Sequence, residues 1–172
     1  MSSHVKWFVL GIAITLVFLA GGAYLFVKAG GISMETTAAP LPLEKTVAGM
    51  ALNASMGHAA DRKNPLPFND DTMLAAARMF KQNCAVCHGI PGQPPTLILK
   101  GMFPPPPQLF EKQDMVTGDP EGETFWVVTH GIRLSGMPGF GSTLSDTERW
   151  QVTTLVAHAD KLSPAVQAEL SH

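Results

Sequence analysis

Several residue types are scarce in this 172-residue chain, and each scarcity excludes a class of protein. Only two cysteines are present, too few for a small disulfide-held scaffold. Charged residues make up 15% of the chain and the net charge is -2, so no bulk positive charge is available to bind nucleic acid. One tyrosine beside 14 prolines and 16 glycines argues against a strand-rich sandwich and favours helices joined by long irregular loops.

The hydrophobic residues are concentrated near the amino terminus. Between Trp7 and Val27 no charged residue occurs, and a helix of this length spans roughly 31 Å, the thickness of a bilayer core. A cleaved signal peptide is the alternative, with Gly21-Gly22-Ala23 as its small-residue site. The apolar run continues beyond that site, so we expect an uncleaved membrane anchor over residues 1–28. Either interpretation exports the rest of the chain, in a bacterium to the periplasm.

Residues 29–68 are expected to form a periplasmic linker. Its first part holds paired glycines and two prolines, and residues 43–61 have the spacing of a helix. The segment Asn64-Pro65-Leu66-Pro67 then imposes an extended backbone.

A compact helical domain is expected over residues 69–162, followed by a tail at 163–172. Asn69 or Asp70 can cap a helix that runs to Asn83, and a second short helix spans 121–131. A last helix begins at Ser145, where Glu148 completes a capping box. Between the first two helices lies a loop dense in proline and glycine, residues 89–107.

The two cysteines form the strongest motif, Cys84-Ala85-Val86-Cys87-His88. This C-x-x-C-H spacing is typical of covalent c-type haem attachment, because both thiols reach the vinyl groups of one porphyrin while the adjacent imidazole faces the iron. A thioredoxin-like pair would need a βαβ setting, and a zinc site would need more ligands. A chance match is the remaining alternative, since the motif has three fixed residues. We therefore expect one covalent haem c with iron held by His88.

The second axial ligand is sought among nine methionines. Met137 lies in a loop of glycine and proline, Gly136-Met137-Pro138-Gly139, which can fix a thioether against a flat ring. It follows His88 by 49 residues, enough chain to reach the opposite face of the haem. Met102, only 14 residues after His88, is the weaker alternative because it is expected near the His88 side. His130 would serve only if Met137 were displaced.

Together these motifs resemble class I cytochromes c, specifically membrane-anchored single-haem bacterial cytochromes related to the cytochrome subunits of haem-copper oxidases. The resemblance rests on the stretches MFKQNCAVCHGIPG, FWVVTHGIRLSGMPGFG and LSDTERWQVTTLVAHADKL, and on the prolines before Gln108. It implies a small all-α fold in which the first and last helices of the domain cross beside the haem. Phe80 and Trp150 would lie near that crossing, with Ala76 allowing close approach.

The resemblance also implies partners for the haem and its ligand. His88 should donate its second ring N–H to a proline carbonyl, either Pro106 or Pro107. Arg133 is expected to pair with a haem propionate, and the indole of Trp126 to donate a hydrogen bond there.

We therefore expect a membrane-anchored periplasmic electron carrier of the bacterial inner membrane that exchanges electrons with redox proteins of a respiratory chain. No carboxylate pair or nucleophile–base cluster predicts hydrolysis, so no small-molecule substrate is expected. The alternatives are a haem subunit of a larger oxidase or dehydrogenase complex, and a haem-based enzyme or gas sensor whose methionine is labile.

Overall fold

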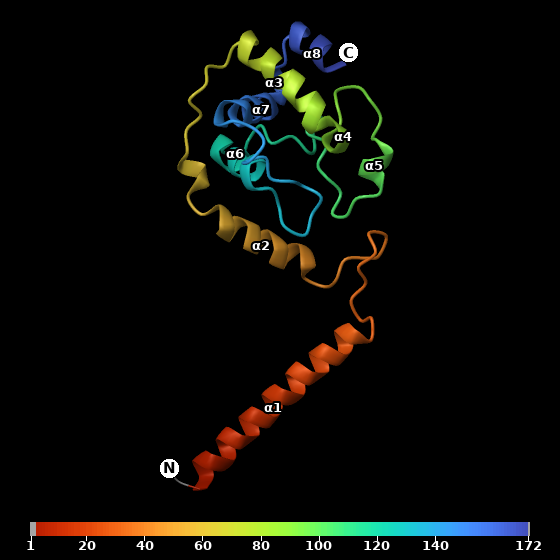
Figure 1. The fold of residues 1–172 in the computed structure, drawn as a ribbon, viewed down its shortest axis with the longest axis vertical. Helices are drawn as coiled ribbons and strands as arrows, with labels where there is room; N and C mark the ends of the chain where they lie inside the picture. The colour runs from red at the N-terminus through yellow and green to blue at the C-terminus, as the bar shows by residue number, and fades with distance from the viewer. Residues whose placement is uncertain (1–2, 172) are drawn as a thin grey trace. The chain divides into compact units, whose positions relative to one another are not determined.

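A computed structural model of the chain describes residues 3–171. Within that range the regular elements are all helical, which confirms the expected all-α class (Figure 1). The chain divides into two compact units, with the boundary between Pro42 and Leu43.

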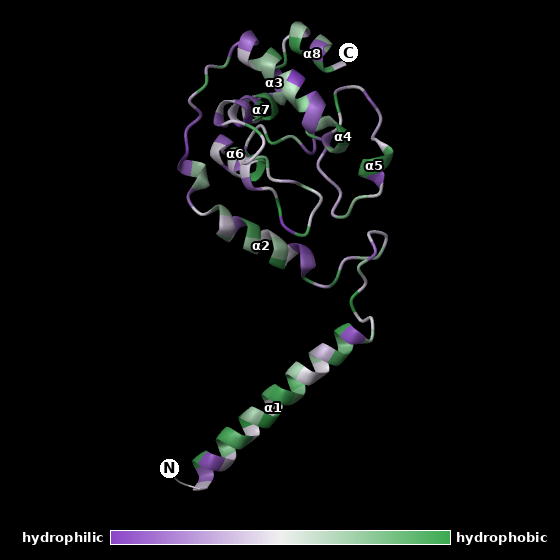
Figure 2. Ribbon diagram, viewed as in Figure 1, coloured by the Kyte–Doolittle hydropathy of each residue, from purple (hydrophilic) through white to green (hydrophobic). Residues whose placement is uncertain are grey.

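The first unit is dominated by α1, Ser3–Lys28. Figure 2 shows hydrophobic residues over most of its length, and none of its residues is buried against the protein. Among the described residues, α1 is the one helix long and apolar enough to cross a membrane. A bilayer is the solvent in which such an exposed apolar surface is stable.

The second unit holds the remaining helices. In chain order they are α2 (Glu44–Met56), the 3-10 turn η1 (Ala59–Asp61), α3 (Asp70–Asn83), α4 (Ala85–His88), α5 (Leu97–Lys100), α6 (Glu121–His130), α7 (Asp146–Ala157), the 3-10 turn η2 (Ala159–Lys161) and α8 (Pro164–Ser171). The α7 helix packs against both α3 and α6, and α3 also packs against α8 (Figure 1). The main core is therefore built around α3.

Local sequence explains where the principal helices begin. The Asn69 side chain accepts a hydrogen bond from Thr72 N at 2.9 Å, which caps α3. Ser145 and Glu148 form the expected capping box at the start of α7. At the carboxyl end of α6, Gly131 takes a φ of 68°, a conformation that glycine adopts at little cost.

The chain end differs from the expected tail. Residues 164–171 form α8, with Pro164 at its first position, where the missing N–H costs nothing. Val166 and Leu170 are fully buried and belong to the same hydrophobic core as Ala76 and Phe80. Their four-residue spacing was the signal that the sequence offered for this helix.

The segment before α3 is docked on the helices rather than free of them. Asn64 Nδ2 donates to Glu121 Oε2 at 2.6 Å and to Thr154 Oγ1 at 2.8 Å. The rings of Phe68 and His158 lie 4.3 Å apart. Thus part of the expected linker contacts α6, α7 and the turn after α7, because its polar side chains find partners that local sequence does not reveal.

Trp150 is also placed differently from the expectation. Ala76 and Phe80 lie in the core around α3, as the resemblance implied. Trp150 instead stacks on Phe125 of α6, with ring centroids 4.1 Å apart. The large ring therefore joins α7 to α6, and smaller residues of α7 such as Val152 and Val156 belong to the core that includes α3.

Candidate haem site

The cysteines and His88 lie on one helical turn between α3 and the following loop. The backbone N–H groups of Cys87 and His88 both donate to the Cys84 carbonyl, at 3.1 and 2.9 Å. Both thiols are free and half-buried. Burial raises the pKa of the Cys84 thiol to about 12, and the neighbouring Cys87 adds to the rise. The turn therefore presents two thiols and an imidazole from five consecutive residues, 84–88.

A proline carbonyl orients His88. Its Nδ1 lies 2.9 Å from the Pro107 oxygen, so the ring donates there and leaves Nε2 with a free lone pair. Of the two prolines that the sequence left open, the structure brings Pro107 to the ring. Burial lowers the pKa of His88, although the Pro107 hydrogen bond partly opposes the shift. The neutral imidazole that a metal requires is thereby favoured.

Gln108 also stabilises the candidate site, a role that the sequence did not predict. Its side-chain amide donates to Cys87 O at 3.1 Å and to Pro106 O at 3.3 Å. Its backbone N–H donates to Asp114 at 3.0 Å. Gln108 therefore fastens the cysteine–histidine turn to the proline-rich loop, and its position next to that loop was the only signal in the sequence.

Met137 is held by backbone pairing between two segments, 128–132 and 137–141. Its carbonyl accepts from Ile132 N at 3.1 Å, and its own N–H donates to Ser135 Oγ at 3.1 Å. Further along, Phe140 N donates to Val128 O at 2.9 Å. Met137 itself is half-buried, so its thioether is shielded but not enclosed by protein.

Two glycines permit this pairing. A Cβ at Gly131 would lie 2.7 Å from the Met137 oxygen, and a Cβ at Gly139 would lie 2.7 Å from the carbonyl of His130. Both clashes would be with backbone, which cannot turn aside as a side chain can. The Met137 loop thus depends on glycine at positions 131 and 139.

Met102 lies nearer to Met137 than the sequence suggested. Its terminal methyl contacts Gly136, the residue directly before Met137. The short spacing from His88 therefore does not keep Met102 away from the Met137 loop.

The remaining predicted residues are less constrained. Arg133 is exposed and has no ion pair or hydrogen bond within residues 3–171. Trp126 is half-buried, and its ring lies 4.7 Å from that of the exposed His130. Neither side chain is committed to a protein partner that would prevent a contact with a propionate.

The donor set fits a c-type haem. Two thiols at the right spacing and an oriented neutral imidazole come from one side. Half-buried apolar or soft side chains that a flat ring could cover include Met102, Trp126, Ile132 and Met137. Among the described residues, no cluster of three or more histidine, cysteine or carboxylate side chains offers a site for a bare metal ion.

Comparison with known families gives the same assignment. The model of the family described as cytochrome c oxidase, cbb3-type, subunit III matches residues 71–156, half of the chain. The chain belongs to this cytochrome c family. Its matched range begins in α3 and ends in α7, so it contains the cysteine–histidine turn and the Met137 loop. Membership supports haem binding and an electron-transfer role, either as a carrier or as an oxidase subunit. Neither the curated proteins nor the solved structures gave a significant match.

Proposed function

We propose that the protein is a membrane-anchored periplasmic cytochrome that transfers single electrons through one haem c. Cys84 and Cys87 would attach the haem, while His88 and Met137 would ligate its iron. The observation that carries the proposal is the Cys84–His88 turn with His88 Nδ1 held on Pro107 at 2.9 Å. When bound, the haem supplies one-electron chemistry between the ferrous and ferric states.

The chain's own residues would keep that chemistry confined to electron transfer. The Pro107 carbonyl fixes the tautomer of His88 and raises the basicity of Nε2. The Met137 loop holds a thioether, a soft ligand that favours the reduced state and raises the potential. If His88 and Met137 both ligate the iron, no ligand position is left for a substrate, so the protein would act as a carrier.

The α1 helix supports anchoring at the bacterial inner membrane. An exposed apolar helix of 26 residues is long enough to span the hydrocarbon core. If α1 is retained, the protein stays with membranes after a high-salt wash, since salt weakens charge contacts but not hydrophobic insertion. A mature chain released by salt, or beginning near Tyr24, would identify α1 as part of a cleaved signal.

A second candidate is a haem subunit of a larger respiratory oxidase, because the matching family is described as an oxidase subunit. Its redox partners would then be neighbouring subunits. Extraction in mild detergent separates the two proposals: a carrier purifies alone, whereas a subunit purifies with oxidase components.

Exposure of the reduced protein to carbon monoxide at neutral pH tests the carrier role directly. A carrier with both axial positions occupied does not bind carbon monoxide at neutral pH. Rapid binding would instead support a haem-based enzyme or gas sensor with a labile methionine.

A further inference from the structure

Thr129 joins the Met137 loop to the rest of the domain. Its carbonyl accepts from Gly141 N at 2.9 Å, at the end of the loop that carries Met137. Its hydroxyl donates to Phe125 O at 2.7 Å and accepts from Arg149 Nη1 at 2.9 Å. One residue near the end of α6 therefore fixes the loop through its backbone and contacts α7 through its side chain.

Arg149 is the contact on α7, and it is buried, with 7% of its surface exposed. A buried guanidinium is costly unless its donors are satisfied. Here Nη2 pairs with Asp146, Nε donates to Ser145 O at 3.4 Å, and the guanidinium carbon lies 5.3 Å from the centre of the Phe125 ring. These contacts leave Arg149 little freedom, so it holds Thr129 in one place.

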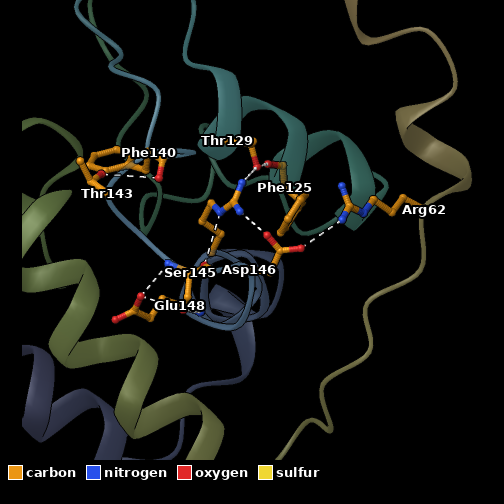
Figure 3. Close-up of polar contacts among 9 residues, drawn as sticks. Arg62, Phe125, Thr129, Phe140, Thr143, Ser145, Asp146 and Glu148 are labelled. Carbon is orange, nitrogen blue, oxygen red and sulfur yellow. Dashed lines mark hydrogen bonds and ion pairs between the residues drawn. The ribbon is translucent and has the colours of Figure 1, made fainter.

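Asp146 forms a second ion pair, with Arg62 of the segment before α3. Arg62 Nη2 lies 3.6 Å from its carboxylate, and the Arg62 guanidinium carbon lies 4.2 Å from the centre of the Phe125 ring. Figure 3 shows the Asp146 carboxylate directed toward Arg62, with the Phe125 side chain beside it. Because Arg62 and Asp146 are both largely exposed, this outer pair contributes less than the buried one.

We propose that Arg149 is a positioning residue for Met137, acting through the Thr129 hydroxyl. This rests on the proposed function, in which the Met137 thioether ligates haem iron. Only three residues separate Met137 from Gly141, and Pro138 restricts the backbone between them. A shift of Thr129 therefore moves the thioether, and a less well-placed thioether is displaced more easily by a competing ligand.

The test is the affinity of the oxidised protein for exogenous imidazole, measured by loss of the near-infrared band of methionine-ligated ferric haem. Thr129→Val keeps the shape of the side chain and removes the hydroxyl, while Thr129→Ser keeps the hydroxyl. We expect Thr129→Val and Arg149→Lys to bind imidazole about tenfold more tightly than wild type, since one hydrogen bond to a charged group is lost or weakened. Thr129→Ser should bind it as wild type does.

Glu148→Gln supplies the matched control. Glu148 lies in the same turn as Arg149 and caps α7 with Ser145, and Figure 3 shows it directed away from Thr129. This variant should lower the melting temperature and leave the imidazole affinity unchanged. Wild-type affinity in Thr129→Val, equal tightening in Thr129→Ser, or tightening in Glu148→Gln would overturn the positioning role. A wild type that lacks the near-infrared band would instead overturn Met137 ligation itself, and the inference with it.

Discussion

The two sides of the candidate haem site are built in different ways. On the His88 side, the thiols and the imidazole come from five consecutive residues, and one helical turn orients them. On the Met137 side, a single thioether depends on backbone pairing between residues 128–132 and 137–141 and on Arg149 from α7. A short motif can be recognised wherever it occurs, whereas a ligand held by distant segments has to be found through the fold.

The largest expected effect is on the His88 side. Replacing both Cys84 and Cys87 with alanine removes the only thiols of the chain and should abolish covalent haem attachment completely. Mass spectra of protein matured in a host that exports it and attaches haem would show the bare polypeptide for this double variant. Met102→Ala is the control and should carry the haem mass. A bare polypeptide mass for the wild type would contradict the proposed attachment.

A smaller effect is expected from a change confined to the Met137 side. In Gly139→Ala the new methyl group would lie 2.7 Å from the backbone of His130, which cannot move away without shifting the loop. We expect a loss of about 1–3 kcal/mol in the free energy of unfolding, measured by denaturant titration, together with intact haem attachment. The control is Gly118→Ala, where an added Cβ meets nothing within 4 Å. Equal stability of the two variants would show that the close backbone approach is not required.

The smallest expected effect is on stability, and it comes from the capping box at the start of α7, which lies on neither the His88 side nor the Met137 side. Hydrogen bonds from the backbone and hydroxyl of Ser145 lower the pKa of Glu148 below its usual 4.5. A lowered pKa in the folded state means that the cap stabilises the protein above the unfolded pKa and is lost as pH falls through the folded value. The melting temperature, measured between pH 3 and pH 7, should fall less steeply with decreasing pH in Glu148→Gln than in wild type. An equal fall in both proteins would exclude the capping box as a source of acid sensitivity.

The features predicted correctly from the sequence are those that neighbouring residues determine. The caps at Asn69 and Ser145 and the helix end at Gly131 follow from side chains within a few residues of each boundary. The helix α8 was missed because it is only eight residues long, and it is held by burial of Val166 and Leu170.

The contacts that the sequence did not predict are long-range. Asn64 bonds to Glu121 and Thr154, and Trp150 faces Phe125 rather than the crossing of α3 and α7. Spacing along the chain also misplaced Met102 relative to the Met137 loop. Each of these contacts joins residues that lie far apart in the chain, so tertiary packing fixes the partner and the local sequence does not reveal it.

The near-infrared spectrum of the oxidised protein, recorded for wild type, Met137→Ala and Met102→Ala, tests the proposed axial pair most directly. We expect the band of methionine-ligated ferric haem in wild type and Met102→Ala, and its loss in Met137→Ala. The potential of Met137→Ala should fall by on the order of 0.1 V or more, because axial ligands shift haem potentials over about 0.8 V. A wild type without the band, or a band that survives in Met137→Ala and disappears in Met102→Ala, would contradict ligation by His88 and Met137.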